Sequence, residues 1–412
     1  MNDVSFTYFL FILGCQFNYY DAEKLAIALD SIGGNEVVDV KDASVAIIFA
    51  CSVRQKAADR ILGHIRNWKE INPKLKVIVT ACVLPPDRKR LLRSTDLIVD
   101  EKELINDPQK YLSKLSFRPR RRNPLFRVTL SPVSTRQVGR GGRFSGVRKA
   151  VSGANNEPQR LSNYQLTDYG KTAYVTITAG CNNFCSYCAV PLVRGRETSK
   201  PLPLIVSEIN DLSTRGYKSI MLLGQNVNSY GLSDYSPRDM RKNKSPLGKK
   251  WSKDNPSPFV KLLREIAKID GLKKISFLSP NPQDMSDDLI DWMKAEKKFA
   301  RDLNLPVQSG SNRILKRMNR RYSRAEYLTL VKKIRSAVPG IYLSTDIIVG
   351  FPGETKKDFE DTVDVVKKCK FNKAFISIYS PRPGTASAMI DNDVSYTEKK
   401  RRWDKLNKMI NL

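Results

Sequence analysis

The stretch that decides the fold is TAYVTITAGCNNFCSYC, residues 172–188. Its first half is rich in Thr, Tyr, Val and Ile and predicts a strand. Its second half places three cysteines, Cys181, Cys185 and Cys188, in the spacing C-x3-C-x2-C on one tight loop. Three soft thiolate ligands directly after a strand predict a metal or cluster site at the end of that strand.

The number of ligands narrows the choice of metal. Structural zinc normally takes four protein ligands, the fourth being a cysteine or histidine. The only histidine of the chain, His64, lies far away in an expected N-terminal helix, where we expect a surface or packing role. Three thiolates on a four-iron cubane leave one iron open to bind something else, and this arrangement favours a reactive cluster. A structural zinc loop is the alternative.

From residue 171 to the C-terminus, strand-like and helix-like stretches alternate. The expected strands are 172–180, 218–228, 273–280, 302–310, 341–350 and 373–381, and the expected helices include 203–216, 258–269, 323–338 and 356–369. Six consecutive β-α units predict a partial (β/α)6 barrel. In such barrels the chemistry lies at the carboxyl ends of the strands, where the cysteine loop is expected.

The N-terminal part has a similar alternation. Its expected strands are apolar runs at 6–13, 43–50, 74–81 and 96–100, and its expected helices are 18–34 and 53–71. Continuous apolar runs are typical of parallel strands that are buried on both faces. We therefore expect a small doubly wound α/β domain before the barrel.

Three further cysteines lie at matching places in this N-terminal domain. Cys15, Cys51 and Cys82 each follow an expected strand and are 36 and 31 residues apart. The carboxyl ends of parallel strands share one sheet edge, so these thiols are expected to form a common site there. Three separate buried packing cysteines are the alternative. A lipoprotein cleavage site at Leu13-Gly14-Cys15 is disfavoured, because residues 1–5 contain no Lys or Arg.

The composition bounds the partners and the compartment. The chain has 71 Lys and Arg against 42 Asp and Glu, a net charge of +29, which favours a polyanionic partner. Residues 108–156 hold 12 Lys and Arg and no acid, which leaves +17 for the rest. This basic segment is either a flexible linker that binds single-stranded RNA or a solvated insertion. Seven clustered cysteines indicate a reducing, cytoplasmic setting, and no stretch is long enough to span a membrane.

The cysteine loop at the end of a first barrel strand resembles that of the radical S-adenosylmethionine (SAM) superfamily. The resemblance implies a [4Fe-4S] cluster on Cys181, Cys185 and Cys188. In that superfamily the open iron binds SAM, whose reductive cleavage gives a 5′-deoxyadenosyl radical that abstracts hydrogen.

The stretches GCQFNYYDAEKL, CSVRQKAADRILGHI, VTACV, VPLVRGRETSKP, LLGQNVNSYG and DIIVGFPGET are similar to the methylthiotransferases, in particular to the tRNA-2-methylthio-N(6)-dimethylallyladenosine synthase type. The resemblance implies a second, auxiliary [4Fe-4S] cluster, which carries or donates sulfur, on Cys15, Cys51 and Cys82. It covers about residues 5–115 and 171–412. The expected domains are an N-terminal methylthiotransferase domain (1–116), a basic linker (117–170) and a radical SAM barrel (171–412).

The chain also departs from the family pattern. Phe49-Ala50 replaces the usual Asn-Thr before Cys51, Asn281-Pro282 stands where Ser-His-Pro is common, and Lys200 replaces an arginine. None of these changes removes a cluster ligand. The family continues into a C-terminal RNA-binding β-barrel, whereas this sequence ends at Leu412, so we expect that β-barrel to be absent.

Other residues are weaker candidates. Gln225, Asn226, Gln308 and Asp346 lie at or near expected strand ends and are candidates for hydrogen bonds to SAM; structural polar layers at the barrel mouth are the alternative. Cys369 is expected in a helix, as a packing residue away from both clusters.

The expected activity is insertion of a methylthio group at carbon 2 of an N(6)-prenylated adenosine next to the anticodon of tRNA. The resemblance further implies a monomer that needs an external electron donor and a sulfur source. The alternatives are a threonylcarbamoyl-adenosine tRNA methylthiotransferase, a ribosomal-protein aspartate methylthiotransferase, and a non-enzymatic iron–sulfur RNA-binding protein. Arg54 and the stretch SPRPGT favour the prenyl-adenosine type.

Deleting residues 118–149 tests the basic segment. Because counterions released on binding scale with phosphate contacts, we expect the deletion to weaken tRNA binding and to flatten its dependence on salt. Binding isotherms over a salt series measure the slope of log K against log salt concentration. An unchanged slope assigns the segment to a solvated insertion.

Overall fold

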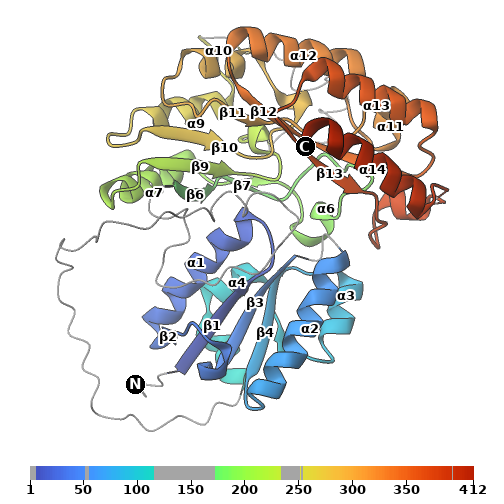
Figure 1. Ribbon diagram of the computed structural model, residues 1–412. Helices are drawn as coiled ribbons and strands as arrows, with labels where there is room; N and C mark the ends of the chain where they lie inside the picture. Colours follow the sequence, from blue (N-terminus) through green and yellow to red (C-terminus); the bar gives the residue numbers. More distant parts are fainter. Residues whose placement is uncertain (1–5, 52–54, 116–171, 233–250, 252–253, 392) are drawn as a thin grey trace, which may run out of the picture.

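The computed structural model describes the chain except residues 1–5, 52–54, 116–171, 233–250, 252–253 and 392. The described part forms two α/β domains stacked on one another (Figure 1). Residues 116–156 of the basic segment, the whole expected linker (117–170) and Arg54 lie outside the described residues.

The N-terminal domain is a five-stranded parallel sheet in the order β2-β1-β3-β4-β5. Its strands are β1 (Phe6–Ile12), β2 (Gly34–Glu36), β3 (Val45–Cys51), β4 (Lys76–Cys82) and β5 (Leu97–Ile98). Its helices are α1 (Gln16–Ser31), α2 (Gln55–Ile71), α3 (Pro85–Leu91), α4 (Glu101–Asn106) and α5 (Pro108–Leu112).

Both faces of this sheet are buried, as the apolar runs predicted. Alternate residues of β1 point to opposite sides: Tyr8 and Leu10 join the core under α1, whereas Phe9 and Phe11 join the core under α2. Trp68 and His64 of α2 pack on Phe11, with ring centroids 4.7 Å away in each case. The doubly wound architecture is therefore confirmed, and His64 has a packing role.

One edge strand was missed from the sequence. The expected helix 18–34 ends at Ser31, and β2 begins at Gly34 and pairs with β1. A Cβ atom at Gly34 would lie 2.8 Å from the Leu29 carbonyl oxygen and 2.9 Å from the Phe6 ring, so only glycine allows the strand to pass this close. The glycine pair ends the helix, as expected, but also starts a strand.

The second domain contains six parallel strands in two groups of three, β6-β9-β10 and β11-β12-β13. They are β6 (Thr172–Thr176), β9 (Ser219–Leu223), β10 (Lys274–Phe277), β11 (Asp302–Asn304), β12 (Tyr342–Val349) and β13 (Lys373–Ile378). A parallel bridge from Ile275 to Phe299 joins the two groups. The six strands thus form one curved, open set, and the partial (β/α)6 barrel is confirmed.

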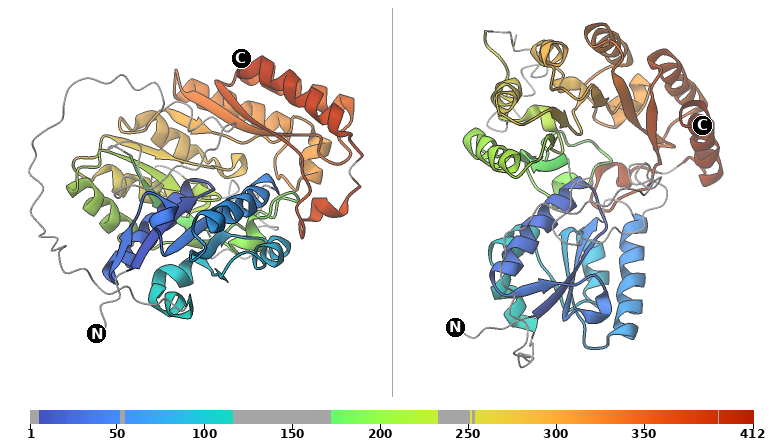
Figure 2. Two further views of the ribbon diagram at one scale, coloured as in Figure 1. Left: turned by 60° about the horizontal axis from the view of Figure 1, so that its bottom comes forward. Right: turned by 60° about the vertical axis from the view of Figure 1, so that its left-hand side comes forward.

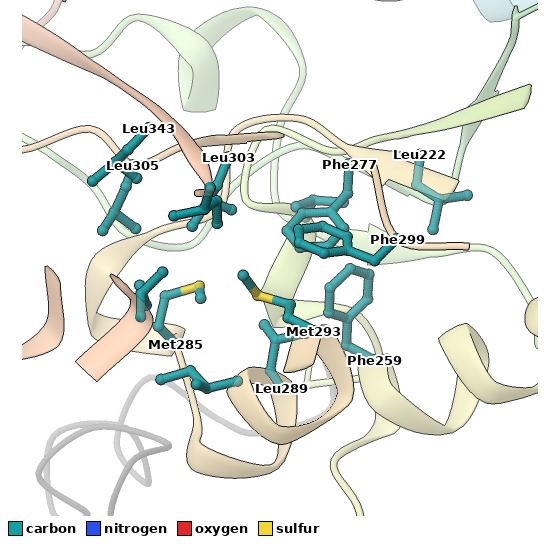
Figure 3. Packing of buried hydrophobic residues seen from close by; sticks show 14 of the residues in the cluster. Leu222, Phe259, Phe277, Met285, Leu289, Met293, Phe299, Leu303, Leu305 and Leu343 are labelled. Atoms are coloured by element: carbon teal, nitrogen blue, oxygen red, sulfur yellow. The ribbon is translucent and has the colours of Figure 1, made fainter. Parts of the chain in front are cut away.

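Helices cover the outside of the barrel (Figures 1 and 2). They are α7 (Leu202–Thr214), α9 (Pro258–Ala267), α10 (Asp287–Ala295), α11 (Asn312–Arg317), α12 (Arg324–Ala337), α13 (Lys356–Cys369) and α14 (Tyr396–Ile410). The core beneath them is tightly packed around Phe277, whose ring lies 5.4 Å from Phe259 and 5.8 Å from Phe299 (Figure 3). Cys369 is buried in this core, in a helix as predicted.

The alternation along β12 defines the inner face of the barrel. Leu343, Ile347 and Val349 belong to the core beneath the outer helices. Because neighbouring side chains of a strand point to opposite faces, Asp346 and Ile348 lie on the inner face. The inner face therefore carries the polar residues available for a ligand.

The two domains share an apolar contact. Phe17 and Tyr20 of α1 pack against Leu223, at the end of β9. The Tyr20 hydroxyl also donates a 3.1 Å hydrogen bond to the Glu208 carboxylate of α7. The carboxyl ends of β3 and β4 point toward the barrel (Figure 1). The sheet edge that carries the N-terminal cysteines thus faces the other domain.

No helix in the described part of the chain is long and apolar enough to cross a membrane.

Candidate cluster sites

The loop that carries Cys181, Cys185 and Cys188 follows the first barrel strand. A short antiparallel pair, β7 (Thr178–Ala179) with β8 (Thr198–Ser199), brings its two ends together. Gly180 passes directly under Arg196, and a Cβ atom there would lie 2.1 Å from the Arg196 carbonyl oxygen. The Gly180 amide also donates a 2.7 Å hydrogen bond to the Gln225 side chain. The loop is therefore fixed in place before its first cysteine.

Two side chains donate hydrogen bonds to sulfurs of this loop. Asn183 Nδ2 lies 3.5 Å from Cys181 Sγ, and Arg320 Nη1 lies 3.4 Å from Cys185 Sγ. Burial raises the pKa of Cys181 to about 12 and that of Cys188 to about 11. These thiols therefore stay protonated at neutral pH until a metal displaces the protons.

The N-terminal cysteines also form a group. Cys51 and Cys82 are paired residues at the ends of the adjacent strands β3 and β4, and Cys15 is the N-cap residue of α1. Burial raises the pKa of Cys82 to about 12, and negative charge on Cys51 or Cys15 would raise it further. The three thiols are thus near enough to interact electrostatically.

One arginine of the barrel domain reaches this group. Arg194 follows α6 (Val190–Val193), the single helical turn after the cysteine loop, and its Nε donates a 3.1 Å hydrogen bond to Cys82 Sγ. Its Nη2 lies 3.1 Å from Asp21 Oδ2. The side chain is only 6% exposed. The contact joins two positions that are 112 residues apart in the sequence.

The donor sets fit iron–sulfur clusters. None of the seven cysteines forms a disulfide, and each group supplies three thiols without a nearby histidine. No three His, Cys, Asp or Glu side chains of the described residues converge closely enough for a single metal ion. A structural zinc ion normally takes four protein ligands. Three thiols in each group would leave one iron of a four-iron cubane without a protein ligand, so the chemistry of each donor set suits such a cluster.

The four candidate SAM contacts divide into two pairs. Gln225 and Asn226 follow β9, beside the cysteine loop; Asn226 donates a 2.7 Å hydrogen bond to Asp284. Gln308 and Asp346 lie on the other half of the barrel, where the Gln308 amide donates a 2.8 Å hydrogen bond to the Asp346 carbonyl. Among the described residues, Asn226 Oδ1 and Gln308 Oε1 are buried and have no hydrogen-bond partner, which suits a polar ligand in the barrel. Their role as SAM contacts stays a prediction.

The backbone is strained near these groups. Ala81, Phe184 and Gln308 have positive φ angles of 72°, 47° and 64°. Such angles are uncommon for residues other than glycine and are often found at functional sites. They lie next to Cys82, next to Cys185 and at a candidate SAM contact, respectively.

Four charged residues of these sites were not singled out from the sequence: Arg194, Glu197, Asp284 and Arg320. Glu197 is buried, accepts a 2.7 Å hydrogen bond from Ser229, and has its pKa raised to about 8, mainly by burial. Arg194 and Glu197 both lie in VPLVRGRETSKP, where four charged residues follow a short apolar turn. That pattern alone also fits an exposed loop, so the sequence held no decisive signal.

Comparison with known proteins identifies the family. Residues 175–366 match the radical SAM superfamily, and residues 7–100 match the uncharacterized protein family UPF0004. Among solved structures, the radical SAM methyltransferase TsrM from Kitasatospora setae has a TM-score of 0.52 at 15% identity over 93% of this chain and 75% of its own. The cobalamin-dependent radical enzyme OxsB has a TM-score of 0.54 at 14% identity over 98% of this chain and 55% of its own. These structures share the fold.

The barrel and its C-x3-C-x2-C loop thus define a radical SAM enzyme. Sequence relatives are more specific. tRNA-2-methylthio-N(6)-dimethylallyladenosine synthases from Caldicellulosiruptor saccharolyticus and Clostridium novyi are 36% and 38% identical over 98% of this chain, and the matches cover 78% and 81% of those proteins. The chain belongs to this family of radical SAM methylthiotransferases. An iron–sulfur protein that only binds RNA is thereby disfavoured.

Glu197 gives a prediction about pH. The folded chain keeps this proton up to about pH 8, whereas an unfolded glutamate releases it near pH 4.5. The folded state thus binds more protons in this window, and its stability falls as the pH rises from about 4.5 to 8. We expect Glu197→Gln to unfold at the same urea concentration as the parent at pH 4.5, and to be more stable by on the order of 2 kcal/mol at pH 9.

Urea titrations of the metal-free chain, followed by circular dichroism, measure this difference. The exposed residue Glu70 of α2 supplies a matched control, Glu70→Gln. Equal pH profiles for Glu197→Gln and the parent would show that the buried carboxyl is ionised throughout.

Proposed function

We propose that this enzyme inserts a methylthio group at carbon 2 of an N(6)-prenylated adenosine next to the anticodon of tRNA. The relatives named above carry this activity in their names. One observation supports it most strongly: the chain has two separate three-cysteine groups, one at the edge of the N-terminal sheet that is directed at the barrel and one on the loop after the first barrel strand. Radical chemistry alone needs one such group, whereas sulfur insertion needs a second site for the sulfur.

We further propose that each group binds a [4Fe-4S] cluster. Cys181, Cys185 and Cys188 would hold the cluster that binds SAM. Cys15, Cys51 and Cys82 would hold the auxiliary cluster. When bound, the clusters would supply an electron and sulfur, and SAM would supply the carbon-centred radical and the methyl group.

The protein's own residues hold and shield these groups. Arg320 is half-buried beside Cys185, and its charge offsets that of the thiolates. Gln225 fixes the start of the cysteine loop through the Gly180 amide. The unpaired oxygens of Asn226 and Gln308 offer acceptors to SAM, with Asp346 on the same inner face. Placing the polar groups inside a barrel excludes water from a radical site.

The charge of the chain suits tRNA. Besides the basic segment, Arg88, Lys89 and Arg90 form an exposed run on α3, which begins three residues after Cys82. We propose domains at 1–116, 117–170 and 171–412, a monomeric state and a cytoplasmic location. An external electron donor and a sulfur source complete the reaction.

Cysteine substitutions test the proposal. The parent, purified and reconstituted without oxygen, should hold about eight irons per chain. We expect Cys82→Ala to hold about four irons and to keep SAM cleavage, measured as 5′-deoxyadenosine, but to form no methylthio nucleoside in tRNA. Cys185→Ala should lose both SAM cleavage and the methylthio nucleoside, because the SAM-binding cluster then lacks a ligand. Mass spectrometry of tRNA nucleosides reads out the product.

Cys369→Ala is the matched control, because this cysteine is buried in the barrel core away from both groups. It should keep about eight irons and both activities. A parent with only about four irons, or a Cys82→Ala variant that still forms the methylthio nucleoside, would contradict the two-cluster proposal.

A further inference from the structure

The cysteine loop of the barrel and the thiols of the N-terminal domain are joined by one side chain. We propose that Arg194 is a positioning residue that ties the SAM-cysteine loop to the auxiliary thiol group and raises the reduction potential of the cluster bound there. This inference rests on the proposed function, because it takes Cys15, Cys51 and Cys82 as cluster ligands.

The main chain around Arg194 is fixed to the SAM-cysteine loop. The Arg194 amide donates a 2.8 Å hydrogen bond to the Val190 carbonyl, which closes the turn of α6. The carbonyl of the next residue, Gly195, accepts a 3.3 Å hydrogen bond from the Cys181 amide. A shift of Arg194 would therefore move the first cysteine of the loop.

The side chain of Arg194 is fixed to the other domain. Its Nε donates to Cys82 Sγ at 3.1 Å, while Nη2 lies 3.1 Å from Asp21 Oδ2 and Nη1 lies 3.7 Å from Glu101 Oε1. Nη2 also lies 3.4 Å from Asn18 Oδ1. These partners come from α1, the end of β4 and α4. A single guanidinium thus spans three elements of the N-terminal domain.

This geometry requires arginine. The guanidinium is planar and directs its N–H groups along fixed, separate directions, whereas lysine presents one compact ammonium. Lysine at position 194 would keep the charge but lose some of the four polar contacts. The Phe17 ring, 5.1 Å from the guanidinium carbon, packs on the planar group and adds a contact that favours arginine.

Charge beside a ligand sulfur affects the cluster. A hydrogen bond to a cluster sulfur and a nearby positive charge both stabilise the reduced, more negative state, and so raise the reduction potential. Arg194 supplies both to Cys82. Its removal would also leave Asp21 and Glu101 buried without their shared cation, which destabilises the same region.

The chain offers a matched control for the loss of a buried contact between the domains. Arg382, from the loop after β13, forms a 2.9 Å ion pair with Asp87 of α3. Its side chain is 4% exposed, against 6% for Arg194. Asp87 stands five residues after Cys82, so this pair also holds the barrel to the N-terminal domain. Arg382→Met therefore removes a guanidinium of similar burial that is paired with a carboxylate.

The test isolates the auxiliary cluster. In full-length chain with Cys181, Cys185 and Cys188 all changed to alanine, the only reconstituted cluster is the auxiliary one. An electron paramagnetic resonance titration against potential then gives its midpoint. We expect Arg194→Met to shift the midpoint to lower potential, Arg194→Lys to shift it less, and Arg382→Met to leave it unchanged.

A second readout uses the enzyme with all its cysteines. If Arg194 fixes the two sites relative to one another, Arg194→Met should lower the ratio of methylthio nucleoside to 5′-deoxyadenosine by roughly tenfold, as is typical for groups that orient metal ligands. Arg382→Met should change this ratio much less.

The outcomes separate the inference from the function. If the triple-alanine chain with Arg194 intact binds no iron at the auxiliary group, the proposed function itself is overturned. A normal parent cluster with the same midpoint and product ratio in Arg194→Met overturns only the role of Arg194. Equal loss of iron in Arg194→Met, Arg194→Lys and Arg382→Met also overturns it, because domain separation alone would then explain the effect. Loss of iron in Arg194→Met alone, with retention in Arg194→Lys, supports it.

Discussion

The arrangement of two parallel sheets, with the carboxyl end of one directed at the other domain, is the constraint on which the sites depend. The carboxyl ends of parallel strands lie along one edge of their sheet. Consecutive β-α units therefore bring cysteines that are distant in the sequence to the same edge. Cys51 and Cys82 meet in this way at the ends of β3 and β4. The barrel supplies its three cysteines on a single loop after its first strand. The positions of the parallel strands therefore determine where each set of thiols lies.

The junction between the domains combines apolar packing with buried charge. Phe17 and Tyr20 pack against the barrel, but apolar contacts alone tolerate sliding and do not fix a register. Arg194 and Arg382 contact their partners at defined distances, and removing one partner of such a buried pair is costly. Both contacts hold the domains together, but only Arg194 touches one of the thiols, Cys82. This suits chemistry in which sulfur held at one group must reach a radical formed at the other.

Much of this organisation could be predicted from the sequence. The apolar runs identified four strands of the first sheet and six of the barrel, because strands buried on both faces leave a continuous pattern. The spacing of the six cysteines singled them out, and their role as cluster ligands stays a prediction. β2 was missed, because three residues at a sheet edge carry no pattern. Arg194, Glu197 and Arg320 were missed because their partners lie far away in sequence, and Asn18 is 176 residues from Arg194. When a charged residue is buried only by residues that are distant in the sequence, its neighbouring sequence does not reveal that burial.

Anaerobic crystallography with anomalous diffraction at the iron edge tests the central claim most directly. We expect two separate iron peaks, one bonded to Cys15, Cys51 and Cys82 and the other to Cys181, Cys185 and Cys188, with each cluster keeping one iron without a protein ligand. A single peak, or a peak with four protein ligands at either group, would contradict it.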